Sequence, residues 1–330
     1  MNILFTLNDA FVPQVATCMC SIFENNKSFE EITVYLIGEK ISQSNREKLK
    51  EFAETYQRKI YFIPINNIAD YIDFDFDTNG WSSIILARLF LDKLLPQDID
   101  RILYLDGDTL VLKDLGEMYD TDLQGKVIGM CPEATVDKGR KEFLALGKLP
   151  YHNSGILLID LKKWRDEEIG RKVIEFYRFH EGKLFAPDQD ALNGALRDQI
   201  LTMPITFNYF NIYDVYPYRT LKELSKPTEF VSQDDFNRFR QAPAIIHYLG
   251  EERPWRRGNT HRFKKEYLHY LHKTPWKDTP MEEGWQLYFI CFRIFNVVMK
   301  PFPMLRYRII NSLIPSFMKF RKRQLQKRKA

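Results

Sequence analysis

Short apolar runs recur along the first 250 positions, and stretches with helical three-to-four-residue spacing separate most of them. The runs predict strands at residues 3–7, 32–37, 59–63, 101–105, 127–130, 156–160, 200–203 and 244–247. The spaced stretches predict helices at residues 11–25, 42–56, 82–94, 162–181 and 189–197. Strands that alternate with helices of this length indicate an α/β fold, with a mainly parallel sheet flanked by helices. Residues 66–80 and 205–242 show no clear period, and we expect irregular loops there.

Several common phosphate-binding and catalytic motifs are missing. The first predicted strand-to-helix turn, residues 6–11, contains no glycine, which excludes the Gly-x-Gly-x-x-Gly dinucleotide fingerprint. The chain also lacks a Gly-x-x-x-x-Gly-Lys phosphate loop, a His-Glu-x-x-His motif and a Gly-x-Ser-x-Gly motif. If this α/β body binds a nucleotide, it must therefore hold the phosphates in another way.

Charge is distributed unevenly along the chain. The 330 residues include 48 basic and 44 acidic side chains, for a formal net charge of +4. The last acidic residue is Glu283, and 11 basic residues follow it, so residues 1–283 carry 37 basic against 44 acidic groups, or −7. An acidic body without a basic footprint argues against nucleic-acid binding, and the basic tail indicates contact with an anionic surface.

Cysteine content and hydropathy bear on location. Four cysteines without a Cys-x-x-Cys pair argue against a zinc finger and against a disulfide scaffold. The first residues lack the positive region and long apolar core of a signal peptide. No uncharged apolar run reaches the roughly 18–20 residues that span a bilayer. These features predict a cytoplasmic protein.

The segment Asp106-Gly107-Asp108 lies between two apolar runs. Ligands of open α/β sheets bind at the carboxyl ends of strands, where these aspartates fall. Two carboxylates one residue apart can converge on a hard cation, which can bridge two phosphate oxygens. The alternative is a simple Asp-Gly turn with solvated carboxylates.

A histidine follows the last predicted strand. Two carboxylates with the imidazole of His247 suit Mn²⁺ better than Mg²⁺, which prefers oxygen ligands. Gly250 permits a close backbone approach, and Arg253 could reach phosphate oxygens. The alternative for His247 is a core histidine with its hydrogen bonds satisfied.

Three further clusters could contact a polar substrate. Asn153 and Ser154 offer donors and acceptors for hydroxyl groups, although they could simply form a turn. Asp188, Gln189 and Asp190 stand at a predicted helix start, where carboxylates can serve only as caps. Arg88 lies among apolar residues and needs a carboxylate or a phosphate as its partner.

In this order the motifs resemble glycosyltransferase family 8, which includes the bacterial lipopolysaccharide galactosyl- and glucosyltransferases and glycogenin. The resemblance covers residues 1–257 and rests on Asp106-Gly-Asp108, Asn153-x-Gly155 with a downstream Leu-Leu-Ile-Asp-Leu-Lys-Lys-Trp164, Asp188-Gln-Asp190, and His247-Tyr-x-Gly250-x-x-Arg253-Pro-Trp255. It implies a GT-A fold, the architecture of nucleotide-diphospho-sugar transferases, over residues 1–280. It also implies Mn²⁺-dependent transfer of a hexose, galactose or glucose, from a UDP-sugar with retention at the anomeric carbon.

The resemblance also implies roles for individual residues. Asp106, Asp108 and His247 would hold Mn²⁺, with Mg²⁺ as the alternative, on the UDP diphosphate. The donor-binding set would be Thr6, Asn8, Phe11, Arg88, Asp106, Gly107, Asn153, Gly250 and Arg253. Asp188 and Gln189 would contact the donor hexose near the reacting carbon. Two positions depart from the family pattern: Asn8 stands where an aspartate often reads the uracil ring, and Arg253 replaces the usual lysine.

Two routes would give retention. One is covalent double displacement, for which Gln189 and Asp190 are the nearby candidates. The other is front-face attack, in which the departing phosphate accepts the acceptor's proton. We favour the second. A sugar nucleotidyltransferase and a non-catalytic nucleotide-sugar or lipid-binding scaffold are the alternative functions, and the chain lacks the Gly- and Lys-rich activation loop of the former.

Residues 281–330 form a basic, aromatic tail. We expect a helix over 286–300 with one narrow polar stripe, a short amphipathic piece over 304–314, and seven basic residues in 319–329. Aromatic and apolar groups beside cations are typical of an interfacial membrane anchor. The alternative is a helix packed on the body with a disordered basic end. We therefore expect a peripheral enzyme that meets anionic lipid through 285–330 at the inner face of the plasma membrane. There it would add hexose to a glycan or glycolipid of lipopolysaccharide or capsule.

Overall fold

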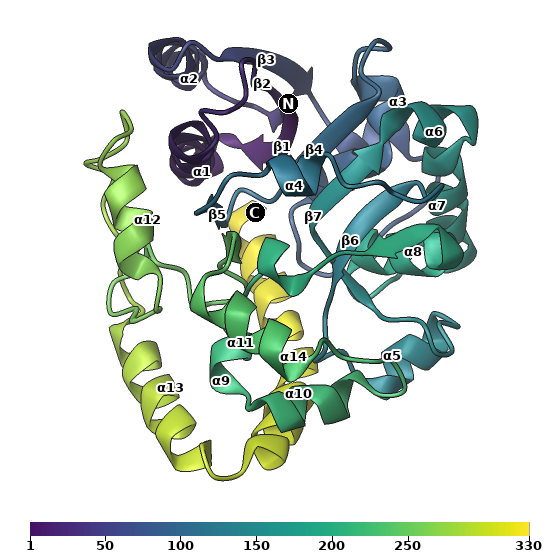
Figure 1. Cartoon of the computed structure of the whole chain (residues 1–330), viewed down its shortest axis with the longest axis vertical. Coiled ribbons are helices and arrows are strands. Elements are labelled where there is room, and N and C mark those ends of the chain that lie inside the picture. The colour runs from purple at the N-terminus through teal and green to yellow at the C-terminus, as the bar shows by residue number, and fades with distance from the viewer. Residues whose placement is uncertain (330) are drawn as a thin grey trace.

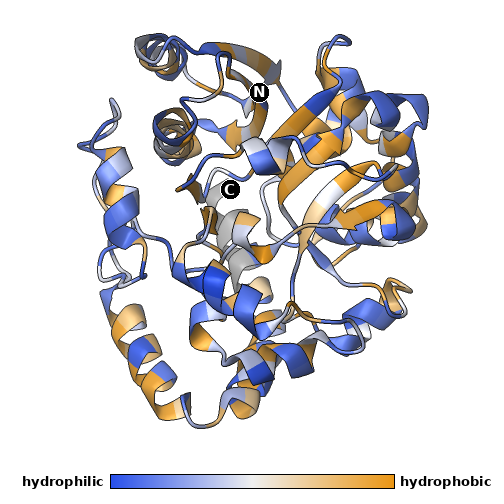
Figure 2. Ribbon diagram, viewed as in Figure 1, coloured by the Kyte–Doolittle hydropathy of each residue, from blue (hydrophilic) through white to orange (hydrophobic). Residues whose placement is uncertain are grey.

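The core of the protein is one seven-stranded sheet (Figure 1), and its strands are mostly hydrophobic (Figure 2). The computed structural model describes residues 1–329, without the side chains of residues 320, 321 and 323–329. The strands lie in the order β3-β2-β1-β4-β7-β6-β8. Their bounds are β1 Asn2–Asn8, β2 Thr33–Glu39, β3 Lys59–Ile65, β4 Arg101–Leu105, β6 Ile128–Pro132, β7 His152–Asp160 and β8 Ile200–Thr202.

Most neighbouring strands in this sheet are parallel. The pairs β1/β2, β2/β3, β1/β4 and β6/β8 are parallel, and only β7 runs antiparallel to its neighbours β4 and β6. The predicted mainly parallel sheet is confirmed. A separate two-stranded antiparallel sheet joins β5 (Thr109–Val111) to β9 (Ile245–His247) beside the end of β4.

Side chains on alternate positions of the strands pack on opposite faces of the sheet. In β1, Ile3 and Phe5 belong to one apolar cluster, while Leu4 between them belongs to the other. The first face is covered by α1 (Val12–Asn25) and α2 (Gln43–Thr55). The second face is covered by the helices α6, α7 and α8, with bounds Leu161–Asp166, Ile169–Phe179 and Pro187–Leu196. Helices therefore flank both faces, as the sequence predicts.

Three local predictions differ from the structure. Residues 82–94 form a 3₁₀ helix, η3 (Ser83–Leu89), and the single turn α3 (Leu91–Leu94), in place of one α-helix. The helix predicted at 162–181 is broken between α6 and α7, where Glu168 adopts a left-handed φ of 51°. The segment 205–242 is not only loop, because it contains α9 (Ile212–Val215), α10 (Tyr218–Ser225) and α11 (Gln233–Gln241).

The remaining short elements connect these layers. They are η1 (Asp9–Phe11), η2 (Ile68–Tyr71), α4 (Gly116–Tyr119), α5 (Lys138–Phe143), η4 (Arg197–Gln199), η5 (Ile205–Phe207) and α12 (Lys264–Leu271).

The C-terminal segment forms a helical hairpin. Helix α13 (Gln286–Met299) lies at the edge of the molecule, and α14 (Pro303–Lys329) returns to the body (Figure 1). The predicted separate piece at 304–314 is wrong, because α14 continues through Pro315 as one helix. None of the helices within the described residues is long and apolar enough to cross a membrane.

Candidate active site

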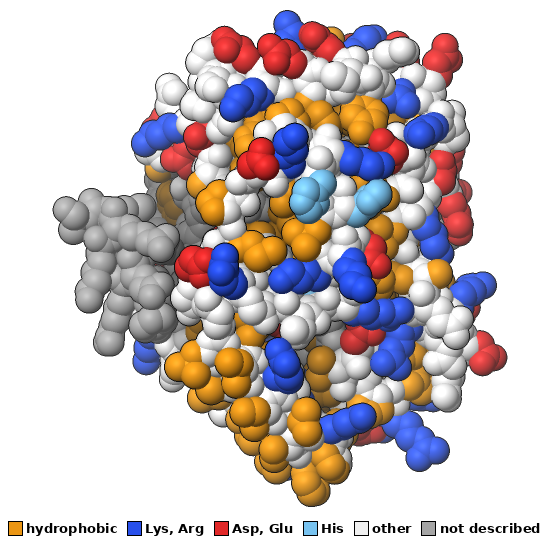
Figure 3. All heavy atoms as spheres, turned by 90° about the vertical axis from the view of Figure 1, so that its left-hand side faces the viewer, with side chains coloured by type: hydrophobic (Ala, Val, Ile, Leu, Met, Phe, Trp, Pro, Cys, Tyr) orange, Lys and Arg blue, Asp and Glu red, His pale blue; other side chains and the backbone are white. Residues whose placement is uncertain are grey.

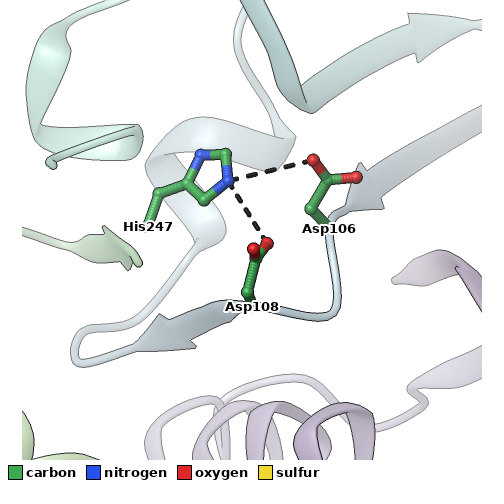
Figure 4. A group of neighbouring side chains, drawn as sticks. All are labelled: Asp106, Asp108 and His247. Carbon is green, nitrogen blue, oxygen red and sulfur yellow. Dashed lines mark ion pairs between the residues drawn. The ribbon is translucent and has the colours of Figure 1, made fainter. Parts of the chain in front are cut away.

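Three potential metal ligands converge beside the end of β4. Asp106 follows β4, Asp108 precedes β5, and the pairing of Thr109 with His247 across β5 and β9 places the imidazole opposite the carboxylates. Nε2 of His247 lies 3.3 Å from Oδ1 of Asp108 and 3.8 Å from Oδ2 of Asp106 (Figure 4). One ligand atom from each of the three residues lies within 4.8 Å of the others. The structure thus brings the three predicted ligand residues together.

The hydrogen bonds of His247 fit a metal ligand. Its Nδ1 lies 2.9 Å from Oδ1 of Asn208, whose Nδ2 donates to Asn153. This orientation of the Asn208 amide makes Nδ1 the donor and leaves the lone pair on Nε2. The Nε2 atom is buried and has no hydrogen-bond partner among the described residues. A divalent cation between this nitrogen and the two carboxylates would satisfy all three groups.

Arg88 organises the carboxylates on one side of the cluster. Its guanidinium is 3% exposed, donates to Oδ1 of Asp106 at 2.7 Å, and lies 3.2 Å from Oδ2 of Asp188. Burial by itself would lower the pKa of Arg88, but the facing carboxylates and Tyr104 raise it above its ordinary value. The Tyr104 hydroxyl donates to the same Oδ1 of Asp106 at 2.6 Å. The other oxygen of Asp106 is thereby left facing His247.

Two glycines allow the chain to pass close to this cluster. A Cβ at Gly155 would lie 2.2 Å from Cε1 of His247 and 2.9 Å from Oδ2 of Asp106. A Cβ at Gly107 would lie 2.9 Å from Cδ1 of Phe11. Any larger side chain at either position would displace a neighbour, so the site needs these two glycines for space.

A polar network extends from the metal ligands toward α8. Oε1 of Gln189 accepts from the backbone N–H of Ser154 at 2.9 Å, and its Nε2 donates to Glu133 at 3.2 Å. Asn153 also donates to Glu133, at 3.0 Å. Oδ2 of Asp188 accepts from the Ser154 hydroxyl at 2.8 Å. The structure therefore brings Asn153, Asp188 and Gln189 together on the Asp106 side of the cluster.

Glu133 is a site residue that the sequence reading missed. It follows directly after β6, as Asp106 follows β4, and strand-end position was the signal that could have identified it. Its carboxylate joins Asn153 to Gln189.

Asp190 occupies a different place from its two neighbours. It is 1% exposed, and its carboxylate accepts from Nε of Arg140 at 2.8 Å, from the Tyr151 hydroxyl at 2.7 Å and from the Ala186 N–H at 3.0 Å. The Tyr151 hydroxyl in turn accepts from Gln189 at 2.9 Å. Among the described contacts, Asp190 is linked to the rest of the site through Tyr151, which fits a supporting role.

The turn after β1 lies next to the metal cluster. The Thr6 hydroxyl is 2.9 Å from that of Tyr104, and Oδ1 of Asn8 is buried without a hydrogen-bond partner among the described residues. Phe11 contacts Trp255 edge-on, with ring centroids 5.9 Å apart. The buried oxygen of Asn8 is free to accept from a ligand.

The loop after β9 brings a cation to the same place. Gly250 has a φ of 72°, a left-handed conformation that favours glycine. Nη2 of Arg253 lies 3.3 Å from Oδ2 of Asp108, and its guanidinium lies over the rings of Phe11 and Trp255. Arg253 thus connects the metal cluster to the turn after β1.

A buried histidine next to Asn153 predicts acid sensitivity. Burial lowers the pKa of His152 to about 4 from an unfolded value of 6.5, so the unfolded chain takes up the proton first. Above pH 6.5 His152 is neutral in both states, and the protein keeps its full free energy of unfolding. As the pH falls toward 4, protonation of this histidine in the unfolded chain lowers the free energy of unfolding by up to about 3 kcal/mol. Denaturant unfolding at pH 7 and pH 4.5 should show a smaller loss for His152→Gln than for the unchanged protein. The exposed-site control His269→Gln should keep the full loss, and equal losses for both variants would contradict the assignment.

The fold and the site together define a class: an α/β protein with an Asp-x-Asp and histidine cluster at the sheet's carboxyl edge that could hold a cation. Residues 2–259 match the family model for glycosyl transferase family 8, and the chain belongs to that family. It is therefore a glycosyltransferase, and enzymes of this family use a nucleotide sugar and a metal.

Individual relatives agree with this assignment. General stress protein A of Bacillus subtilis is 28% identical over 279 residues, which cover 84% of this chain and 94% of that protein. Lipopolysaccharide 1,2-glucosyltransferase of Escherichia coli is 26% identical over 283 residues, covering 84% and 79% respectively. The galactosyltransferase LgtC, solved with donor and acceptor sugar analogues, superposes with a TM-score of 0.71 at 25% identity. That match covers 87% of this chain and 99% of LgtC, and it confirms the predicted GT-A fold.

Proposed function

We propose that this enzyme transfers galactose or glucose from a UDP-hexose to a glycan or glycolipid, with retention at the anomeric carbon. The observation that supports this most strongly is the Asp106–Asp108–His247 cluster, in which the buried Nε2 of His247 has no hydrogen-bond partner among the described residues. The names of two similar proteins support a hexose as the transferred sugar, since one is a glucosyltransferase and the other a galactosyltransferase.

The donor set suits a divalent cation, Mn²⁺ in preference to Mg²⁺, because two carboxylates are joined by one imidazole. When bound, such an ion would neutralise charge on the diphosphate that leaves the sugar. The chain supplies the rest of the electrostatic support. Arg253 lies beside Asp108 and can donate to phosphate oxygens. Gly250 gives the loop before Arg253 the turn that it needs.

Other residues fit the two ends of the donor. Thr6, Asn8 and Phe11 lie at the turn where we place the uridine, and the buried acceptor oxygen of Asn8 suits an N–H of the base. Asp188 and Gln189, which Glu133 and Ser154 join to Asn153, lie where we place the hexose, and Asp188 can accept hydrogen bonds from its hydroxyls. Arg88 holds Asp106 and Asp188 at a fixed spacing, which orients the sugar pocket relative to the cation site.

For retention we propose front-face attack. The candidate nucleophiles for double displacement were Gln189 and Asp190. The carboxylate of Asp190 accepts hydrogen bonds from Arg140, Tyr151 and the Ala186 N–H. These bonds favour a structural role for Asp190 over nucleophilic attack on a sugar. The Gln189 amide is neutral and already bonded at both ends. The departing phosphate is then the group that accepts the acceptor's proton.

Donor preference tests the proposal directly. The purified chain should release UDP from UDP-galactose or UDP-glucose when Mn²⁺ is added and not in the presence of a chelator. Little release should follow from UDP-N-acetylhexosamines or from ADP- and GDP-sugars. Formation of a nucleotide-sugar from UTP and a sugar phosphate would instead indicate a nucleotidyltransferase. Absence of turnover with every donor, despite UDP binding, would indicate a non-catalytic scaffold.

We further propose that the enzyme works in the synthesis of cell-surface polysaccharide, in the cytoplasm and peripherally at the inner face of the plasma membrane. One relative is named as a lipopolysaccharide glucosyltransferase, which supports this pathway. The basic tail of residues 285–330 supports a membrane location through its charge. Side chains of residues 320, 321 and 323–329, which include most of the cations of 319–329, lie outside the described part.

A further inference from the structure

Exposed apolar side chains are concentrated on the C-terminal hairpin. Of the fourteen large hydrophobic side chains that are exposed among the described residues, ten lie between positions 287 and 317. Soluble proteins usually scatter such residues singly, and a contiguous group marks an interaction surface. Hydrophobic side chains gather at the lower end of the face in Figure 3, where α13 and its turn lie in Figure 1.

Helix α13 has two distinct sides. Its inner side packs on the hairpin and the body through Phe289 and Met299, which are 5% and 8% exposed. Its outer side is apolar as well, whereas an ordinary surface helix is polar there. We call this outer side, with the following turn, the α13 stripe. Its members are Leu287, Ile290, Ile294, Val297, Val298 and Phe302, each at least 52% exposed.

The hairpin that presents the stripe is fixed to the body. At its base, the buried guanidinium of Arg256 lies 3.6 Å from the centre of the Trp285 ring. In α14, Arg306 donates to Oδ1 of Asn296 at 3.0 Å and to the Tyr216 hydroxyl at 2.6 Å. Farther along, Lys322 forms an ion pair with Asp77. These contacts use the inner sides of both helices, so the α13 stripe is left facing outward on a rigid support.

The exposed charges within α13 and the turn after it have one sign. Arg293 and Lys300 are exposed there, Arg308 is exposed on α14, and the chain has no acidic residue after Glu283. An anionic membrane interface has acyl chains, which suit an apolar stripe, and above them phosphate headgroups, which suit cations flanking that stripe. A second copy of this chain would not match equally well, since its stripe would bring like charges together.

We infer that the α13 stripe is a membrane-docking surface, which inserts into the interfacial zone of a bilayer containing anionic lipid. Helix α13 lies along the bilayer and does not span it, in keeping with the absence of a spanning helix among the described residues. Arg293, Lys300 and Arg308 contact the headgroup phosphates. The surface is independent of the donor chemistry, and it assigns the membrane contact to the outer side of α13 in place of the last basic residues.

Vesicle binding tests this surface. The full chain should sediment with vesicles of phosphatidylcholine and anionic phosphatidylglycerol, bind neutral phosphatidylcholine vesicles more weakly, and be released by added salt. Ile294→Ser combined with Val298→Ser should lower the affinity for the anionic vesicles by about tenfold or more. Arg293→Gln combined with Lys300→Gln should lower it several-fold and reduce the salt dependence. The matched control Phe179→Ser removes an 81% exposed aromatic residue from the body and should change nothing.

Three other outcomes would contradict parts of these proposals. Unchanged vesicle affinity in the Ile294→Ser, Val298→Ser variant would overturn the inference and leave the extreme C-terminal cations as the contact. A dimer of the unchanged protein in ultracentrifugation that the same variant dissolves would show that a second copy covers the stripe. UDP release from the donor, measured with a soluble acceptor, should be unaltered in all these variants. A protein without UDP release that still binds vesicles would refute the proposed activity alone.

Discussion

Replacing Asp108 by alanine should lower Mn²⁺-dependent UDP release by on the order of 10³–10⁴-fold, equivalent to about 4–5.5 kcal/mol of transition-state stabilisation. Two groups in the site face Asp108: Nε2 of His247 lies 3.3 Å from its Oδ1, and the guanidinium of Arg253 lies 3.3 Å from its Oδ2. The substitution removes a ligand for the cation and also releases the arginine that we place on the phosphates. Steady-state assays at saturating and subsaturating Mn²⁺ measure the effect, and excess metal should not restore the rate.

Asp122→Ala is the matched control, because its exposed carboxylate caps only a local turn through the Gln124 N–H. It should retain the activity of the unchanged enzyme. Mn²⁺-stimulated hydrolysis or transfer at a near-normal rate in Asp108→Ala would refute the assignment of Asp108 as a metal ligand.

Replacing Arg88 by leucine should affect stability and activity together. The guanidinium is the buried cation between Asp106 and Asp188, and its loss leaves two carboxylates in the site without their positive partner. Breaking a buried pair in this way costs about 3–5 kcal/mol of unfolding free energy. The loss of Arg88 also frees Asp106 from its fixed orientation. Denaturant unfolding should show the loss of stability, and UDP release should fall by at least about 10²-fold.

A lysine at this position separates charge from geometry. Arg88→Lys should recover part of the stability but little of the activity, because one ammonium cannot hold both carboxylates as the planar guanidinium does. Arg171→Leu, which removes an exposed arginine paired with Glu168, should unfold at the same denaturant concentration as the unchanged protein. An Arg88→Leu variant with unchanged stability would contradict the buried bridge.

The sequence predicted the sheet well because its strands are short, almost fully apolar runs that leave few alternatives. It predicted the helical segments of 205–242 poorly. There α10 and α11 are short and polar, and each is stabilised by aromatic contacts such as that of Tyr218 with Phe236, which only the folded chain brings together. The break at Glu168 was equally hidden, since a left-handed non-glycine residue leaves no clear signal in sequence.

In the candidate site, the residues near strand ends could be predicted from the sequence. Asp106 follows an apolar run, Asp108 precedes the next one, and His247 ends a third, so position and chemistry together indicated a cation site. The residues that support them could not be predicted in this way. Tyr104 reads as an ordinary strand residue, and Asn208 lies in a segment without a period, yet both orient metal ligands through hydrogen bonds. Such roles depend on contacts between residues distant in sequence.

The central claim is that Asp106, Asp108 and His247 bind a divalent cation through which the enzyme holds the UDP diphosphate. The most direct measurement is calorimetric titration of UDP into the protein with Mn²⁺ and, separately, with a chelator. We expect Mn²⁺ to tighten UDP binding by about 100-fold, or about 2.7 kcal/mol. The enhancement should disappear in His247→Ala while the weak metal-free binding remains. Equal UDP affinity with Mn²⁺ and with the chelator in the unchanged protein would contradict the account.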